Sequence, residues 1–125
     1  MHSTPKYRGT KIFQIIYHEL INASRYRGVI TYQEIAKLMG LPMTGNYMGH
    51  EIGFMLSEIS EDEVHYGRPM LSALAVGVSG EPGEGFYAWA KEMGRLKDDS
   101  SEGHREFWVE EKRKVYEEWK DVIGG

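Results

Sequence analysis

The chain has 125 residues, of which 41% are hydrophobic and 27% are charged, as in a single globular domain. It contains no cysteine, which excludes disulfides, thiolate zinc sites and cysteine nucleophiles. The formal net charge of −4 argues against a protein that coats nucleic acid through bulk electrostatics.

No apolar run reaches the roughly 18 residues of a transmembrane helix, and the N-terminus lacks the apolar segment of a secretory signal. We therefore expect a cytoplasmic protein that does not enter a membrane. The pattern predicts a flexible tail at residues 1–10 and a folded domain at 11–95. The polar sequence L-K-D-D-S-S-E-G at 96–103 is typical of a linker, and a last helix should occupy 104–125.

Apolar residues at steps of three and four predict a first helix over residues 11–23. A natural stop follows at residues 27–28. A second helix begins after Thr31, whose hydroxyl can form a capping box with Glu34. Gly40 ends this second helix.

A third helix begins after residues 44–46. The short apolar segment 70–78 predicts a buried strand, and the glycine-rich segment 79–85 predicts a turn or wing tip. Two further helices are predicted, a short one at 86–93 and a long amphipathic one at 105–123.

This order of elements is that of a winged helix-turn-helix, so we predict an α+β fold of this type with an added C-terminal amphipathic helix. In such modules the second helix of the pair presents its first side chains to the DNA major groove. Here these residues are Thr44, Asn46, Tyr47 and His50. Asparagine can read adenine, and threonine and tyrosine can reach phosphates or bases. The alternative is that Thr44 and Asn46 only cap the helix and that Tyr47 covers its first turn.

The chain reads I-T-Y-Q-E-I-A at 30–36, then a glycine- and proline-containing turn, L-S-A-L-A-V at 71–76 and G-V-S-G. In order and spacing it resembles the C-terminal winged-helix domain of O6-alkylguanine-DNA alkyltransferases and alkyltransferase-like proteins, with V-T-Y-G-E-I-A, P-C-H-R-V-V and a G-x-x-G turn. The resemblance implies DNA binding. It places the family's acceptor cysteine on Ser72 and its histidine on Ala73, so alkyl transfer should be absent. The arginine that replaces a flipped base in the family falls on Asn46.

The basic residues gather near the N-terminus. Lys11, Arg25 and Arg27 are expected to contact phosphates if the fold brings them near the DNA, or else to complement the end of the first helix. Arg68 either bridges the acidic residues 61–63 or reaches a cleft next to Ser72.

We predict a non-enzymatic protein that binds double-stranded DNA and needs no metal or other cofactor. The alternative is a protein-interaction module on the same fold that has lost DNA binding, which the net acidity and the acidic segment 58–63 favour. A protein partner or a second copy would then bind the last helix. A third possibility is an enzyme built around Ser72, whose other groups would be Arg68 and either Glu81 or Glu84; no triad spacing supports it.

Overall fold

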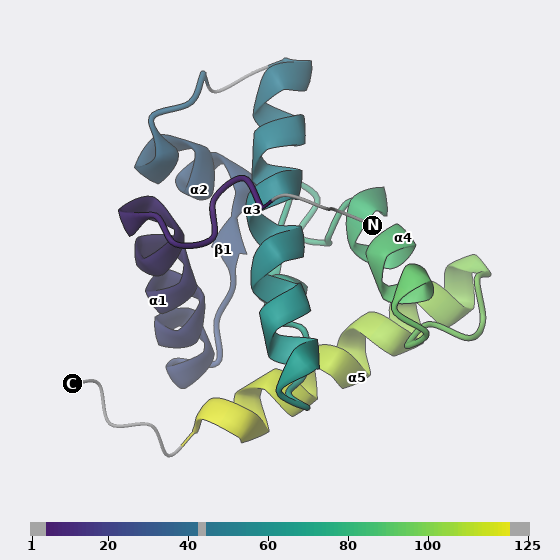
Figure 1. Cartoon of the computed structure of the whole chain (residues 1–125). Helices are drawn as coiled ribbons and strands as arrows, with labels where there is room; N and C mark the ends of the chain where they lie inside the picture. Colours follow the sequence, from purple (N-terminus) through teal and green to yellow (C-terminus); the bar gives the residue numbers. More distant parts are fainter. Residues whose placement is uncertain (1–4, 43–44, 121–125) are drawn as a thin grey trace.

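The computed structural model describes residues 5–42 and 45–120 (Figure 1). In chain order the elements are α1 (Lys11–Arg25), β1 (Ile30–Thr31), α2 (Tyr32–Met39), α3 (Asn46–His65), the 3₁₀ helix η1 (Leu71–Leu74), β2 (Ala75–Val76), α4 (Glu84–Glu92) and α5 (Ser101–Trp119). The two short strands pair in parallel, with Ile30 opposite Ala75. The predicted α+β class therefore needs correction, because the described chain is mostly helical.

The first two helices begin and end where the local sequence predicts. The Thr10 hydroxyl accepts the backbone N–H of Phe13 at the start of α1. Thr31 and Glu34 form the predicted capping box of α2, and Gly40 ends this helix with a left-handed φ of 72°. These boundaries depend on bonds between neighbours in the sequence, so a sequence pattern is enough to predict them.

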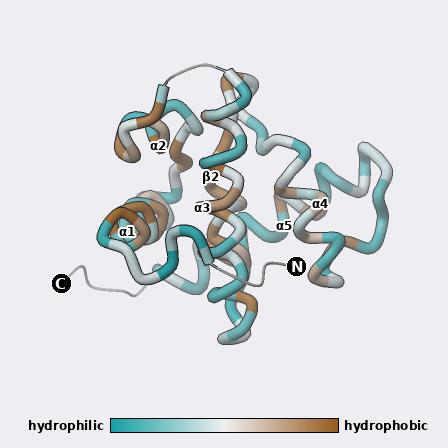
Figure 2. The backbone as a smooth tube through the Cα atoms, turned by 45° about the horizontal axis from the view of Figure 1, so that its top comes forward, coloured by the Kyte–Doolittle hydropathy of each residue, from teal (hydrophilic) through white to brown (hydrophobic). Residues whose placement is uncertain are grey.

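Helix α3 lies between α1 and α2 on one side and α4 on the other, and α5 crosses the lower end of the view in Figure 1. The 3₁₀ helix η1 packs against α1, α3 and α5, and its Leu71 and Leu74 are fully buried. In Figure 2 hydrophobic and hydrophilic segments alternate along α1 and α3, as expected for helices with one face in the core.

The predicted strand and wing at residues 70–85 are corrected by the structure. Only Ala75 and Val76 are extended, and the four residues before them form η1. Their partner is β1 rather than a following antiparallel strand, and no wing hairpin is present in the described part of the chain. The glycine-rich loop instead closes on itself through a bond from the Gly77 N–H to the Glu81 carbonyl, and then enters α4. An apolar run of this length does not distinguish a strand from a buried helical turn.

Helix α5 starts at Ser101, earlier than predicted, because the Ser100 hydroxyl caps it. Its inner face is hydrogen-bonded to the rest of the chain at both ends. The Trp108 indole donates to the Ala73 carbonyl at 2.8 Å, and the Tyr116 hydroxyl donates to the Gly28 carbonyl at 2.9 Å. The predicted stripe on this helix thus serves the domain's own core. Residues 121–123, the end of the predicted amphipathic helix, lie outside the described residues.

None of the helices in the described ranges combines the length and apolar composition needed to cross a membrane.

Candidate functional site

The first turns of α3 are open to solvent. Gly45 is the N-cap of this helix, with a φ of 95° that favours glycine. Asn46 is therefore the first helical residue and not the cap. The side chains of Asn46, Tyr47 and His50 are exposed, and Tyr47 retains 58% of its accessible surface. Thr44, the remaining predicted contact, lies outside the described residues.

Two carboxylates on α3 accept hydrogen bonds from the N-terminal segment. The backbone N–H groups of Lys6, Tyr7 and Arg8 all donate to the carboxylate of Glu58, which is 2% exposed. Glu51 accepts from the Lys6 ammonium at 2.8 Å and from the Tyr7 hydroxyl. The Lys6 bond holds the pKa of Glu51 below its usual value, with a further contribution from Tyr7.

The same segment neutralises the acids further along the helix. Arg8 donates to Asp62 at 2.9 Å and to Glu61 at 3.1 Å. Residues 5–10, which the sequence assigns to a flexible tail, thus lie along α3, because the buried Glu58 carboxylate needs donors and their backbone supplies them. The acidic segment 58–63 belongs to α3. Its charges are paired within the chain.

The predicted phosphate contacts lie in different places. Lys11 is exposed at the start of α1. Arg27 lies over the ring of Tyr116, at 5.6 Å from its centroid, and 3.8 Å from Glu117 on α5. That part of α5 lies near the end of α3, because Arg68 pairs with Glu63 of α3 and lies over the ring of Trp119. The 20 residues of α3 place this end about 30 Å from Asn46. Arg25 and Arg27 are therefore not grouped with the first turns of α3.

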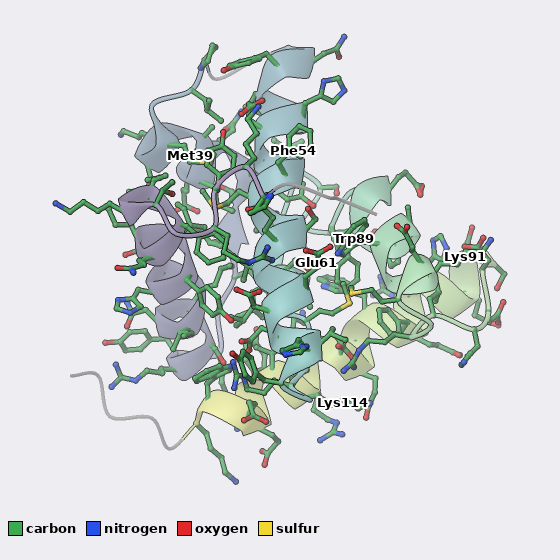
Figure 3. The ribbon with its side chains drawn as sticks, in the orientation of Figure 1. Met39, Phe54, Glu61, Trp89, Lys91 and Lys114 are labelled. Atoms are coloured by element: carbon green, nitrogen blue, oxygen red, sulfur yellow. The ribbon has the colours of Figure 1, made fainter. Side chains whose placement is uncertain are left out.

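An apolar pocket of about 650 Å³ lies beside these first turns, between α3 and α4. Ile52, Phe54 and Leu56 line it from α3, and Phe86 and Trp89 line it from α4. Figure 3 shows Phe54 and Trp89 on these two helices. A pocket with this lining suits an apolar group of a ligand that is bound next to α3.

Tyr32 closes one side of the pocket. Its hydroxyl accepts the Gly83 N–H at 2.7 Å, and a Cβ at Gly83 would lie 3.6 Å from that oxygen. Burial raises the pKa of Tyr32, and the Gly83 bond partly opposes this. The capping box that starts α2 thus also positions a pocket residue.

Ser72 also lines this pocket, but it lacks the partners of a nucleophile. Its hydroxyl is 2.7 Å from the Ser60 hydroxyl, and the residue is 6% exposed. A hydroxyl paired with another hydroxyl has no general base. Two of the other predicted catalytic groups are elsewhere: Arg68 lines a different surface pocket with Tyr17, and Glu81 pairs with Arg105 at 2.9 Å. Glu84 lies between Gly83 and Gly85, which line the same pocket as Ser72. The structure does not assemble the enzyme site considered from the sequence.

Arg68 takes the first of its two predicted roles. Its guanidinium donates two bonds of 3.1 Å and one of 2.8 Å to Glu63, whose side chain is fully buried. The Tyr17 hydroxyl donates to the same carboxylate. Burial first, and then this bond to the Glu63 carboxylate, raise the pKa of Tyr17.

The raised pKa of Tyr17 predicts a loss of stability at alkaline pH. Below about pH 10 the phenol is protonated in both the folded and the unfolded chain. Above that pH the unfolded chain releases the proton first, so the free energy of unfolding should fall by up to about 1.4 kcal/mol per pH unit for each such tyrosine. Urea denaturation between pH 8 and 11 should show this fall, and Tyr17→Phe should make it shallower. An unchanged slope in this variant would contradict the prediction.

Sequence reasoning does not single out the pocket. Phe54, Phe86 and Trp89 come from segments far apart in the chain, and each has the spacing of an ordinary core residue. The sequence also assigns Lys6 to a flexible tail, because no pattern near residue 6 indicates that the distant Glu58 carboxylate accepts its backbone N–H. Comparison with models of known protein families, with curated proteins and with solved structures finds no match.

Proposed function

We propose that this chain binds double-stranded DNA through the first turns of α3, with α2 and α3 as a helix-turn-helix. The observation that carries the proposal is that α3 presents exposed Asn46, Tyr47 and His50 while its acidic side chains are paired within the chain. In a helix-turn-helix the second helix enters the major groove with its N-terminal residues. Asn46 supplies the base-reading amide, and Tyr47 and His50 contact phosphates or bases.

The pairing of the acids makes this proposal compatible with the net charge of −4. Phosphates approaching the start of α3 meet Glu51 already bonded to the Lys6 ammonium, and Glu58 already bonded to backbone N–H groups. Lys6 remains 47% exposed at its side chain. Lys6 and the exposed Lys11 supply phosphate contacts here, whereas Arg25 and Arg27 do not.

The apolar pocket extends the proposal to a modified base. A base that leaves the duplex beside α3 would meet Ile52 and Phe54 on one side and Trp89 on the other. An added alkyl group favours an apolar site, and base extrusion costs least for damaged pairs. The resemblance to alkyltransferase-like proteins supports this function, and the Ser72–Ser60 pair supports binding without alkyl transfer.

A second candidate is favoured by the same pocket. Its lining is almost entirely apolar, so it also suits a hydrophobic side chain of a protein partner. In that case α3 would serve as one wall of a docking groove, and DNA would not bind.

Fluorescence anisotropy of labelled duplexes tests the proposal. One duplex is unmodified and one carries O6-methylguanine, and both are titrated at low and moderate salt. We expect salt-dependent binding to both and tighter binding to the lesion. The double variant Asn46→Ala/Tyr47→Ala should weaken binding at least about fivefold, since a bidentate base contact contributes about 1–3 kcal/mol. Tyr66→Ala removes an exposed tyrosine from the other end of α3 and should leave duplex binding unchanged.

Filling the pocket separates its role from that of the helix surface. A side chain at Gly53 meets open space and lines the pocket. Gly53→Leu should therefore remove the preference for O6-methylguanine and leave binding to the unmodified duplex. Absence of binding to either duplex at low salt would reject the DNA proposal and leave the protein-docking candidate.

A further inference from the structure

A row of arginine and aromatic side chains lies at the end of the molecule away from the start of α3. The Arg27 guanidinium is 5.6 Å from the ring centroid of Tyr116, and that of Arg68 is 5.5 Å from Trp119 and 5.1 Å from Tyr66. Tyr116 and Trp119 are neighbours one turn apart on α5. The contacts therefore join Arg27, Tyr116, Trp119, Arg68 and Tyr66 into one group, here termed the arginine–aromatic row.

Much of this row is accessible. Tyr66 is 67% exposed and the Arg27 side chain is 60% exposed, while Tyr116 and Trp119 are half-buried. Tyr26, next to Arg27 in the chain, is 78% exposed. Exposed aromatic faces beside guanidinium groups are the combination on which the bases of a single strand stack.

Arg27 has a backbone conformation that glycine would adopt more easily. Its φ is 54°, and the adjoining Gly28 N–H closes the end of α1 on the Ala23 carbonyl at 2.9 Å. A non-glycine residue in this left-handed region destabilises the fold. The arginine side chain is mainly exposed, so the core does not require it. Such strained positions concentrate at functional sites.

Exposed basic side chains lie at this end of the molecule, next to the exposed carboxylates of Glu117 and Glu118. Arg27 and Lys120 approach the same carboxylate, that of Glu117, at 3.8 Å and 3.0 Å. Glu63 is fully buried and its carboxylate is paired with Arg68, so this pair adds no net charge to the surface. Arg25 is exposed in the last turn of α1. Arg25 and Arg27 can therefore contact the phosphates of a strand whose bases stack on the neighbouring rings.

We propose that the arginine–aromatic row binds single-stranded nucleic acid. Bases stack on the accessible ring faces of Tyr66 and its neighbours, and Arg27 contacts the phosphates. This surface lies about the length of α3 away from Asn46, so a duplex on the first turns of α3 and a strand on the row do not compete for the same residues. The inference does not depend on duplex binding.

The test is anisotropy of labelled oligo-dT and oligo-U of about ten nucleotides, with an abasic strand of equal length as a control for charge alone. We expect binding to the strands with bases, and clearly weaker binding to the abasic strand. Tyr66→Ala should weaken binding at least about fivefold, the lower limit for loss of one stacked base. The two base-containing probes show whether the row prefers DNA or RNA.

Arg27→Gly separates binding from folding. Glycine relieves the left-handed strain, so the thermal unfolding midpoint should stay the same or rise while affinity falls and the salt dependence becomes shallower. Arg113→Ala, at an exposed ion pair with Glu110 outside the row, should leave affinity unchanged. The Asn46→Ala/Tyr47→Ala variant should also bind the strand normally. Absence of strand binding at low salt, equal binding of the abasic strand, or loss of binding only in the α3 variant would each overturn the proposal.

Discussion

Glu63→Ala is expected to destabilise the domain by about 3 kcal/mol, near the lower end of the range for breaking a buried ion pair. The fully buried carboxylate accepts bonds from both Arg68 and Tyr17, and it joins α3 to α1 and to the segment before η1. Removing this carboxylate leaves the Arg68 guanidinium and the Tyr17 hydroxyl without their hydrogen-bond acceptor. Because the Arg68 side chain is 30% exposed, water can compensate part of this loss. Urea denaturation followed by far-ultraviolet circular dichroism measures the change.

Glu61→Ala is the matched control for this variant. Glu61 lies on the same helix, but its side chain is 29% exposed and its partner Arg8 also bonds to Asp62. An ion pair of this kind contributes about 0–1 kcal/mol. Similar losses in Glu61→Ala and Glu63→Ala would show that the Glu63 network is not the main connection at this end of α3.

Trp108→Ala should destabilise the domain by about 3–5 kcal/mol, the range for removing a buried large aromatic side chain. The residue is 6% exposed, and its indole N–H donates to the Ala73 carbonyl beside the pocket floor. This side chain fixes α5 against η1. Thermal and urea unfolding both measure the loss.

Two further variants separate the contribution of the Trp108 hydrogen bond from that of its apolar volume. Trp108→Phe keeps most of the apolar volume and loses the hydrogen bond, so it should cost much less than alanine. Val109→Ala changes a neighbouring residue that is 49% exposed and should be close to neutral. If Trp108→Ala were also nearly neutral, α5 would have to be an addition that the domain does not need.

The predicted helices illustrate what local patterns can establish. The Thr31–Glu34 box and Gly40 define α2 through bonds within the segment itself. Residues 70–78 were predicted to form a strand, but η1 is set by contacts with α1, α3 and α5. The acidic end of α3 also depends on tertiary contacts, because Arg68 and Tyr17 allow Glu63 to remain buried in the helix.

The sequence by itself determined the number and approximate position of the helices, because amphipathic spacing and end caps act between near neighbours. It also determined that cysteine chemistry is absent and that Asn46, Tyr47 and His50 lie near the start of one helix. Only the tertiary structure decided that residues 6–8 bond to Glu51, Glu58, Glu61 and Asp62 of α3 while Arg68 pairs with Glu63. It also decided that the apolar pocket forms between α3 and α4, and that Arg27 and Arg68 share one row with aromatic rings. Each of these features brings together segments that are distant in the sequence. The burial of their side chains and the pairing of their charges therefore depend on how the helices pack.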